Sequence, residues 1–527
     1  MTGLAGTTQL LRLALRRDRL TLPLWVYGLV VITYVSGKGV ATTFPTQRSI
    51  DAYAAAVGSS PAAIALSGPP IALHTLAGIV LNKVSFVAVV GVSLMAILLV
   101  VRHTRAEEDA GRTELLGASV VGRYAGPAAA LLTALGASLV VGAGTALALL
   151  VCRVPAAGAW VFGAEVAALG AVFATGTLCL AQLLGSARAA TGAGLVLLGA
   201  AYVLRAVGDI RADAVVWTSP IGWSQATHPL GGDRWWPLLV SVVASLLLTG
   251  LAALLVERRD VGAGLLPARR GSATAGRTLR GPVGLAWRLE RGAVLAWAAG
   301  LFVVALVVGS LTDQIEQMAR QNPILGRYLH SPAPGAVVEA FFGTMLLILA
   351  LSAAAFAVSS ALHLRSEEIS RRLEPLLAAP LTRQWWMLGR LLVTAVAAAA
   401  LLALSGLGVG LSYGEATGDP GQALRMAGLA LVYLPAVLVL PALVALLHGW
   451  APTWARSAWA VLAFCFVLGW LGGLLNPPDW LSGLSPFQHT PEVPGEPVAV
   501  GPLVAIGASV VLLAGAGLLG FRRRDVG

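Results

Sequence analysis

The sequence has little charge. Asp, Glu, Lys and Arg make up 12% of its 527 residues, whereas soluble globular domains have roughly 25%. Hydrophobic residues make up 57%. Apolar runs of about twenty residues, long enough to cross a bilayer as helices, recur along the chain. This composition excludes an ordinary soluble domain and predicts an all-α polytopic membrane protein.

Cysteine is scarce as well. Cys152, Cys179 and Cys465 are far apart and follow no disulfide or zinc spacing. We interpret them as small apolar residues inside helices, and we expect no metal site.

Lysine is nearly absent, since Lys38 and Lys83 are the only two. The net charge of +11 therefore comes from arginines. These cluster at the ends of apolar runs, as the positive-inside rule describes. The charge thus predicts contact with membrane lipid and no nucleic-acid partner.

Motifs for ATP hydrolysis and metal chemistry are missing. A phosphate-binding loop needs G-x-x-x-x-G-K-[ST], whose backbone N–H groups and lysine hold the phosphates. The only Gly-Lys pair, Gly37 and Lys38, lies in an apolar run, and no H-E-x-x-H occurs. The sequence predicts that this chain is not itself an enzyme.

Twelve segments are long and apolar enough to span a membrane. We expect the first six spans at about 22–43, 79–101, 124–151, 158–184, 188–207 and 237–256. We expect the second six at about 293–312, 340–363, 388–413, 423–447, 456–475 and 500–520.

The basic residues indicate the orientation. With an even number of spans, both termini lie on one side, and the segments on that side hold 26 of the 36 lysines and arginines but 12 of the 25 acids. Because cytoplasmic loops carry an excess of basic residues, we expect both termini in the cytoplasm and the chain in the cell membrane.

A charged segment occurs twice. Residues 105–123, RAEEDAGRTELLGASVVGR, align without a gap with residues 365–383, RSEEISRRLEPLLAAPLTR, and eight of nineteen positions are identical. Each copy lies between the second and third spans of its half. A loop that needs only charge could drift, so the preserved spacing predicts a docking surface for a protein partner.

The shared positions of the two copies are the candidate docking residues. They are Arg105, Glu107, Glu108, Arg112, Glu114, Leu116 and Arg123 in the first copy, and Arg365, Glu367, Glu368, Arg372, Glu374, Leu376 and Arg383 in the second.

Further matches flank these copies in the same order. Arg16 and Asp18 align with Arg288 and Glu290, and ERRDVG at 257–262 aligns with RRRDVG at 522–527. The repeat predicts two parallel six-span halves with pseudo-twofold symmetry. Their expected bounds are 1–262 and 284–527, with a cytoplasmic linker at 263–283.

Proline and threonine predict the local structure of the two copies. Pro375 lacks an N–H and disfavours a helical Glu374, so we expect a helix break there and a short helix near 375–379 ended by Pro380. In the first copy, we expect Thr113 to cap the corresponding helix.

An amphipathic segment precedes the first span of each half. In residues 10–20, Arg12, Arg16 and Arg19 share one helical face, which is typical of a helix lying in the membrane interface. Residues 285–297 carry Arg288 and Arg291 in the same role. Transmission of motion and simple membrane anchoring both remain open for these segments.

These features together resemble the permeases of type-2 ATP-binding-cassette exporters, and in particular the fused antibiotic-exporter permeases of the tetronasin or polyketide kind. The resemblance extends over essentially the whole chain. It implies that 105–123 and 365–383 are coupling segments that seat in ATPase subunits, and that 10–20 and 285–292 are connecting helices. Pro375 departs from the family pattern and leaves open whether the two docking sites are equal.

The resemblance also implies the partners and cofactors. Two coupling segments imply two copies of a separate ATPase subunit. That subunit would hold ATP and Mg²⁺, and this chain would hold no cofactor of its own.

Ionisable residues inside spans are costly and often mark a transport pathway. Lys38, Lys83, Glu165 and Glu339 lie near the outer ends of their spans, where snorkelling to the interface is the alternative explanation. The otherwise apolar spans predict a hydrophobic or amphipathic small-molecule substrate. We expect the outer segments 44–78 and 313–339 to form short helices over an exit.

We therefore expect the permease of an ATP-driven exporter of drugs, antibiotics or lipids, working by alternating access. A twelve-span secondary transporter of the major-facilitator kind, driven by an ion gradient, is the alternative. A membrane scaffold without transport activity is a third possibility.

Overall fold

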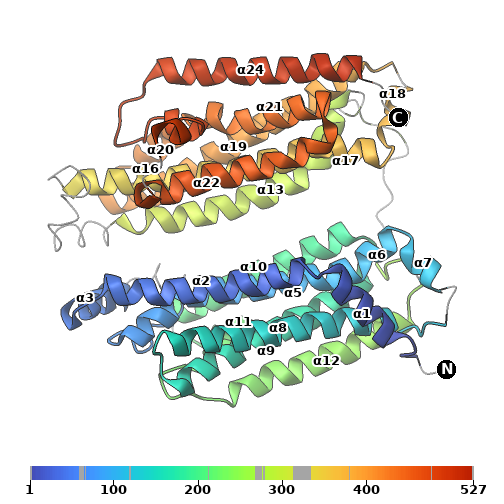
Figure 1. Cartoon of the computed structure of the whole chain (residues 1–527). Coiled ribbons are helices and arrows are strands. Elements are labelled where there is room, and N and C mark those ends of the chain that lie inside the picture. The colour runs from blue at the N-terminus through green and yellow to red at the C-terminus, as the bar shows by residue number, and fades with distance from the viewer. Residues whose placement is uncertain are drawn as a thin grey trace. The chain divides into compact units, whose positions relative to one another are not determined.

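A computed structural model of the chain describes residues 3–524 apart from 59–63, 66, 118, 119, 212, 261, 267–273, 275, 277, 278, 280, 313–333, 379, 476 and 477. It divides into two compact units, Met1–Gly271 and Ser272–Gly527. Both are helical, and the described residues contain no β-strand (Figure 1). The all-α prediction is confirmed.

Unit 1 is built from long apolar helices joined by short ones. The long helices are α2 (Thr21–Thr43), α5 (Leu76–His103), α8 (Ala125–Val151), α9 (Ala156–Leu183), α10 (Ala187–Arg211) and α12 (Pro237–Glu257). The short ones are α1 (Thr7–Arg17), α3 (Gln47–Gly58), α6 (Arg105–Asp109), α7 (Arg112–Gly117), the 3₁₀ turn η1 (Ala214–Thr218) and α11 (Pro220–Gln225).

Unit 2 has a corresponding set of helices. The long ones are α13 (Pro282–Gly309), α16 (Pro334–Ala361), α19 (Arg383–Thr417), α21 (Leu434–Trp450), α22 (Ala458–Leu475) and α24 (Val500–Arg523). The short ones are α17 (His363–Ile369), α18 (Leu373–Leu377), α20 (Gln422–Leu431), η3 (Pro452–Ser457), α23 (Asp479–Ser482) and η4 (Pro486–His489).

Equivalent helices pack in equivalent pairs. In unit 1, α8 packs against α2, and α9 packs against α5 and α12; in unit 2, α19 packs against α13, and α21 packs against α16 and α24. The two units thus share element order and neighbours. The duplication itself, its linker at 263–283 and its symmetry stay predictions.

Glycines allow helices to pack closely. A Cβ on Gly142 of α8 would lie 2.4 Å from the carbonyl oxygen of Gly163 on α9, and one on Gly449 of α21 would lie 2.2 Å from that of Gly517 on α24. Without a hydrophobic force between helices in lipid, such close backbone packing is a main source of association.

Eleven helices among the described residues are long and apolar enough to cross a membrane. The chain is therefore a multi-pass membrane protein. The predicted span at 456–475 corresponds to α22, which is not among the eleven. The span predicted at 423–447 is made of two helices, α20 and α21, with a break at Val432 and Tyr433.

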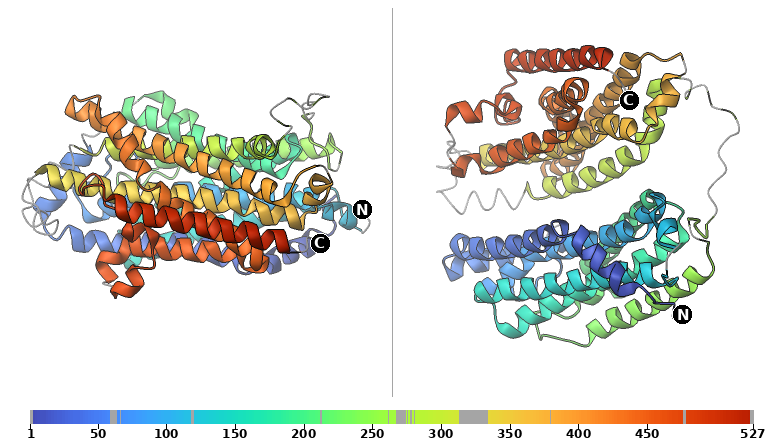
Figure 2. Two further views of the ribbon diagram at one scale, coloured as in Figure 1. Left: turned by 90° about the horizontal axis from the view of Figure 1, so that it is seen from above. Right: turned by 45° about the vertical axis from the view of Figure 1, so that its right-hand side comes forward.

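The charged segments lie at one end of each unit. In unit 1, α6 and α7 lie at the same end as α1, and α3 lies at the opposite end (Figure 1). In unit 2, α17 and α18 lie at the end where α24 finishes. Figure 2 shows α1 at an angle to the long helices of unit 1.

Candidate functional site

Each charged segment is a helix–turn–helix at the end of a long helix. The break falls at the same aligned position in both copies, because Gly111 has a φ of 70° and Arg371 a φ of 55°. The N–H of each donates to the carbonyl of the glutamate three residues earlier, Glu108 at 2.9 Å and Glu368 at 3.0 Å. A left-handed residue therefore turns the chain between α6 and α7 and between α17 and α18.

Two local predictions were wrong in detail. The predicted break and short helix of the second copy are present, but the break precedes Pro375, since α17 ends at Ile369 and α18 begins at Leu373 and contains Glu374 and Pro375 in its first turn. A proline is tolerated there because the first N–H groups of a helix have no intrahelical partner. Thr113 is not the cap of its helix, because α7 already begins at Arg112.

Glu108 joins three parts of unit 1. It accepts from Arg105, with Nη1–Oε2 at 2.8 Å, and from Arg259 at the end of α12, with Nη1–Oε2 also at 2.8 Å. Arg105, only 1% exposed, also donates to the carbonyls of Ala181 and Ala263. The charged segment is thereby fixed to α9 and to the segment after α12.

Glu368 makes the corresponding contacts in unit 2. It pairs with Arg365, with Nη1–Oε2 at 3.3 Å, and with Arg524 after α24. Arg524 aligns with Arg259 in the sequence repeat. The same ion pairs therefore join the charged segment to the last helix of each half.

The arginine that ends each charged segment makes the same hydrogen bond in both copies. Arg123 donates to the carbonyl of Arg259 at 2.6 Å, and Arg383 donates to the carbonyl of Arg524 at 2.7 Å. Both ends of each segment therefore bind the end of the last helix in the same half.

The two copies differ at the first glutamate. Glu107 pairs with Arg17 of α1 and with Arg112, the latter with Nε–Oε2 at 2.6 Å and Nη2–Oε1 at 2.9 Å. Glu367 pairs instead with Arg390 of α19. The segment is thus linked to α1 in unit 1 and to the third long helix in unit 2.

A buried carboxylate beside a histidine is a feature that the sequence reasoning missed. Asp18, fully buried after α1, contacts His103 at 2.6 Å and Arg102 at 2.8 Å. Glu290 of α13 contacts His363 at 2.7 Å. His103 and His363 align in the repeat two residues before the charged segments, which is the signal that would have found them.

Glu290 also accepts from Arg390 at 2.8 Å. Arg390 therefore bridges Glu290 of the first helix and Glu367 of the charged segment in unit 2. Arg390 is 3% exposed, so this charge is neutralised inside the protein.

The predicted connecting helices differ from one another. In unit 1, α1 (Thr7–Arg17) is separate from α2, and Arg12, Arg16 and Arg19 are exposed. In unit 2, residues 285–292 are not a separate helix, because α13 runs without a break from Pro282 to Gly309. Arg288 and Arg291 are exposed on its first part.

Several predicted docking residues face outward. Arg112, Glu114, Arg372 and Glu374 are exposed, whereas Arg105 and Glu108 lie inside unit 1. Leu376 is partly buried against a cluster that includes Leu373, Trp386 and Phe521. The side chain of Leu116 lies outside the described residues.

Hydrogen bonds at the charged segment of unit 1 shift the pKa values of Arg112 and Tyr124. The hydrogen bond to Glu107 raises the pKa of Arg112, so this guanidinium stays charged. The hydrogen bond to Glu257 raises the pKa of Tyr124, which keeps its hydroxyl protonated as the donor.

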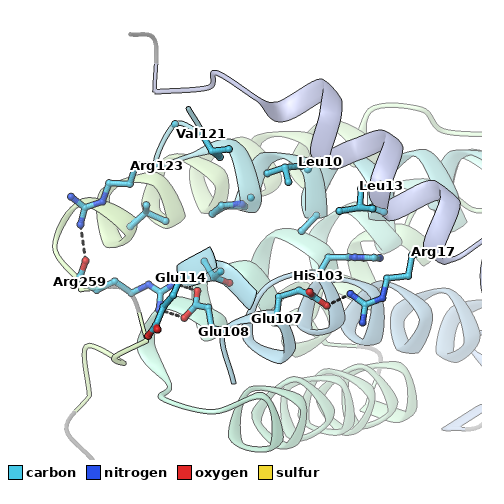
Figure 3. A pocket seen from close by; sticks show the side chains of 18 of the residues that line it. Leu10, Leu13, Arg17, His103, Glu107, Glu108, Glu114, Val121, Arg123 and Arg259 are labelled. Atoms are coloured by element: carbon cyan, nitrogen blue, oxygen red, sulfur yellow. Dashed lines mark hydrogen bonds and ion pairs between the residues drawn. The ribbon is translucent and has the colours of Figure 1, made fainter. Parts of the chain in front are cut away.

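A recess of about 720 Å³ lies beside the charged segment of unit 1. Leu10, Leu13 and Arg17 reach it from α1, and Glu107 and Glu114 reach it from α6 and α7 (Figure 3). Its lining also includes Arg123 and residues of α8 and α12.

The predicted pathway residues of unit 1 have separate neighbours. The ammonium of Lys38 lies 5.8 Å from the ring centre of Tyr34, and that of Lys83 lies 5.1 Å from the ring centre of Tyr53. Both lysines are exposed.

Glu165 and Glu339 differ in burial. Glu165 is 3% exposed and accepts from the hydroxyl of Thr227 at 2.8 Å. Glu339 is partly exposed and lies 3.7 Å from Arg425. A transport role for these residues stays a prediction.

The outer segments are partly described. Residues 44–78 contain the predicted short helix as α3. Most of the segment 313–339, residues 313–333, lies outside the described residues, so its predicted helix is not addressed.

The three cysteines are free, and the described residues contain no group of metal-ligating side chains. Cys179 and Cys465 are buried, as the sequence predicted, and Cys152 is partly exposed.

Two comparisons relate the sequence to known proteins. Residues 279–522 match the family model described as multidrug efflux system permease Rv1217c, C-terminal domain. The chain is also 41% identical over 531 residues to the multidrug efflux system permease protein Rv1217c of Mycobacterium tuberculosis, an alignment that spans 100% of this chain and 96% of that relative.

Proposed function

The chain belongs to the family of multidrug efflux system permeases, and from this premise we propose that it is the membrane-spanning subunit of an ATP-driven, ATP-binding-cassette exporter. It moves hydrophobic or amphipathic drugs out of the cell by alternating access. Two separate ATPase subunits bind its segments 105–123 and 365–383. The narrower tetronasin or polyketide kind stays a prediction.

The observation that carries the proposal is the repeated ion-pair pattern around the two segments. Glu108 with Arg259, and Glu368 with Arg524, join each segment to the last helix of its half. Glu107 pairs with Arg17 of α1 and thereby joins the segment of unit 1 to that helix. Glu367 pairs with Arg390 and joins the segment of unit 2 to α19. A displacement of the exposed tip would therefore reach several long helices at once.

The exposed side chains supply the docking surface in this proposal. Arg112 and Glu114 project from α7, and Arg372 and Glu374 occupy the aligned positions. The ATPase would contact this outer layer, while the buried pairs behind it transmit the motion. ATP and Mg²⁺ belong to the ATPase, whose phosphate-binding loop this chain lacks.

The predicted pathway residues are also part of this proposal. Lys38, Lys83, Glu165 and Glu339 lie in helices that cross the membrane, where charge is costly unless it serves transport or reaches the interface. The ion-gradient alternative is not favoured, because the relative is named as the permease of an efflux system, which implies further components, whereas a secondary transporter needs no partner subunit.

The decisive experiment separates hydrolysis from transport. The permease, co-purified with its ATPase and reconstituted in vesicles, is compared with the double variant Glu107→Ala and Glu367→Ala. We expect ATP hydrolysis to continue while drug export falls by about ten-fold or more, since the links to Arg17 and Arg390 are lost. Export that stops when a proton gradient is collapsed, with ATP still present, would contradict ATP-driven transport.

A second pair of substitutions, with a matched control, tests the links between the charged segments and the last helices. Arg259→Ala with Arg524→Ala removes the arginine that links Glu108, or Glu368, to the last helix of its half. Arg258→Ala with Arg523→Ala removes two exposed neighbours of the same charge. The first pair should uncouple the exporter and the second should not; equal effects would show that only net charge matters.

A further inference from the structure

A small cavity with polar side chains in its wall lies inside unit 1. It has a volume of about 50 Å³, and its lining includes Asn82 and Ser85 of α5, Glu165 of α9 and Gln225 of α11. Each of these four residues is 9% exposed or less. Buried polar atoms need partners from the protein or from a bound water or ion. The partners of these four side chains therefore decide what the cavity can hold.

The carboxylate of Glu165 receives at most one hydrogen bond from the described residues. The hydroxyl of Thr227 lies 2.8 Å from Oε2 of Glu165 and also 2.8 Å from the carbonyl oxygen of Ser224. A hydroxyl has a single hydrogen to donate. No other described residue donates to this carboxylate. A buried carboxylate with so few donors is costly unless a positive charge accompanies it.

The wall of the cavity supplies no such charge. Its described lining residues include no lysine, arginine or histidine. Lys83 lies on the same helix as Asn82, but its ammonium is placed over the ring of Tyr53, 5.1 Å from the ring centre, and the side chain is exposed. The charge of Glu165 is therefore not balanced by a lysine in the wall.

Other basic residues near this part of unit 1 are paired, neutral or exposed. Arg205 of α10 is paired with Asp209 at 3.3 Å. Burial lowers the pKa of His228, in the loop after α11, so its imidazole is neutral at pH 7. Arg234 of the same loop is exposed. Glu165 is thus left with a negative charge that the described residues do not neutralise.

Neutral oxygen atoms are present in the same wall. The amide oxygen of Gln225 has no hydrogen-bond partner among the described residues. Oδ1 of Asn82 accepts from the hydroxyl of Tyr53 at 3.0 Å, and the hydroxyl of Ser85 makes no hydrogen bond with a described residue. Carboxylate, amide and hydroxyl oxygens are the ligands that hard cations prefer.

The backbone before α5 packs against the amide of Gln225. A Cβ on Gly68 would lie 2.8 Å from Nε2 and 3.2 Å from Oε1 of this amide, and the φ of 96° at Gly68 also favours glycine. A half-turn of the amide exchanges its oxygen and nitrogen within the same volume, so either atom can face the cavity. The amide is therefore a built part of this wall.

We propose that this cavity binds one alkali-metal cation, with the carboxylate of Glu165 and the side-chain oxygens of Gln225, Asn82 and Ser85 as its ligands. One carboxylate balances one positive charge, which favours a monovalent ion. The set has a single acid and no histidine or cysteine, so it differs from the acid-rich or sulfur-rich groups that hold calcium or zinc. The volume exceeds the roughly 10–15 Å³ that a water needs, so a water can complete the coordination.

We expect one such ion per chain. In the gap-free register that aligns His103 with His363, Asn82 and Ser85 align with Phe342 and Met345, which are apolar. The ion would join α5, α9 and α11 of unit 1 at one point. Its binding does not rest on the exporter function proposed above.

The test uses the purified full chain in detergent without an ATPase. Thermal unfolding is followed by tryptophan fluorescence in sodium, potassium or choline chloride at equal ionic strength. We expect sodium or potassium to raise the unfolding midpoint by about 2–4 °C relative to choline, because the ion binds the folded chain. The ion with the larger effect is the ligand. Radioactive sodium, or rubidium in place of potassium, then measures the affinity and the number of bound ions.

Glu165→Gln separates loss of the site from misfolding. The amide has nearly the same shape and can still accept from Thr227, but it removes the buried charge. We expect this variant to unfold in choline at or above the native midpoint and to lose the alkali-metal shift. Glu415→Gln is the matched control, because Glu415 is exposed near the end of α19 and loses the same charge. It should keep the full shift.

Gln225→Met removes one neutral ligand and leaves Glu165 intact. We expect the affinity for the labelled ion to fall by about ten-fold. Gln47→Met makes the same change at an exposed position of α3 and should leave the affinity unchanged. If Glu165→Gln unfolds below the native midpoint in choline, the comparison of these two glutamine variants decides.

Three results would overturn the proposal. The first is an equal midpoint of the native chain in sodium, potassium and choline, which would mean that the cavity holds only water. The second is an alkali-metal shift that Glu165→Gln retains in full, which would place the ion elsewhere. The third is equal affinity of Gln225→Met and Gln47→Met for the labelled ion.

Discussion

Buried charges of the two charged segments are held by multiple partners. Glu108 pairs with both Arg105 and Arg259, whose side chains are 1% and 8% exposed. Such pairs contribute little net stability when intact, but removal of one member leaves an uncompensated charge. These pairs therefore fix geometry, and their loss is expected to damage the fold as well as coupling.

Glu108→Ala tests this at the residue scale. We expect the free energy of unfolding to fall by about 3–5 kcal/mol, because Arg105 and Arg259 lose their shared counter-charge in a desolvated place. The measurement is denaturant-induced unfolding of the purified chain in detergent micelles. Exposed Glu114→Ala is the control and should change the value by about 0.5 kcal/mol or less. Equal effects of the two would mean that Glu108 is hydrated.

At the scale of elements, the two segments share a turn but differ in their attachments. A left-handed residue separates α6 from α7 and α17 from α18. Unit 1 has a separate α1, and buried Asp18 fixes its junction with α2 to Arg102 and His103. Unit 2 has the continuous α13 and uses Glu290 of that helix instead.

The turn position gives opposite predictions for the two halves. Gly111→Ala should destabilise the chain by about 1 kcal/mol, since a Cβ is disfavoured at a φ of 70°. Arg371→Gly should be neutral or stabilising by up to about 1 kcal/mol, because strain is relieved while the unfolded chain gains freedom. Unfolding midpoints of the two purified variants provide the measurement. A stabilising Gly111→Ala would show that this turn is not left-handed.

At the scale of the whole molecule, each unit is a helical membrane bundle with its charged segment at one end. The predicted orientation places those ends, with both termini, in the cytoplasm. Whether the chain lies this way in the cell decides whether the segments can reach an ATPase.

Labelling of single cysteines tests the orientation. In a chain whose three native cysteines are replaced, Asp233→Cys and Asp419→Cys should react with a membrane-impermeant maleimide on intact cells, because both lie at the predicted outer ends. Arg16→Cys and Arg523→Cys should react only after permeabilisation. The reverse pattern would refute cytoplasmic termini and with them the coupling role.

Patterns along the chain predicted much of the architecture. Apolar runs gave the helices, since a backbone in lipid must satisfy its own hydrogen bonds. The repeat located the two charged segments, whose positions in the fold agree in both units. Local rules failed at Pro375, because a proline is harmless in the first turn of a helix, and at Arg371, whose left-handed conformation has no signal in its residue type.

The sequence by itself determined the membrane class, the helices and the charged repeat, because hydropathy and residue spacing are properties of the linear chain. Only the tertiary structure decided which charges are paired inside and which face outward. It also decided that unit 1 has a recess beside its charged segment and that Trp386 and Phe521 pack in one hydrophobic cluster in unit 2. Both depend on side chains that are distant in sequence and meet only when the helices pack.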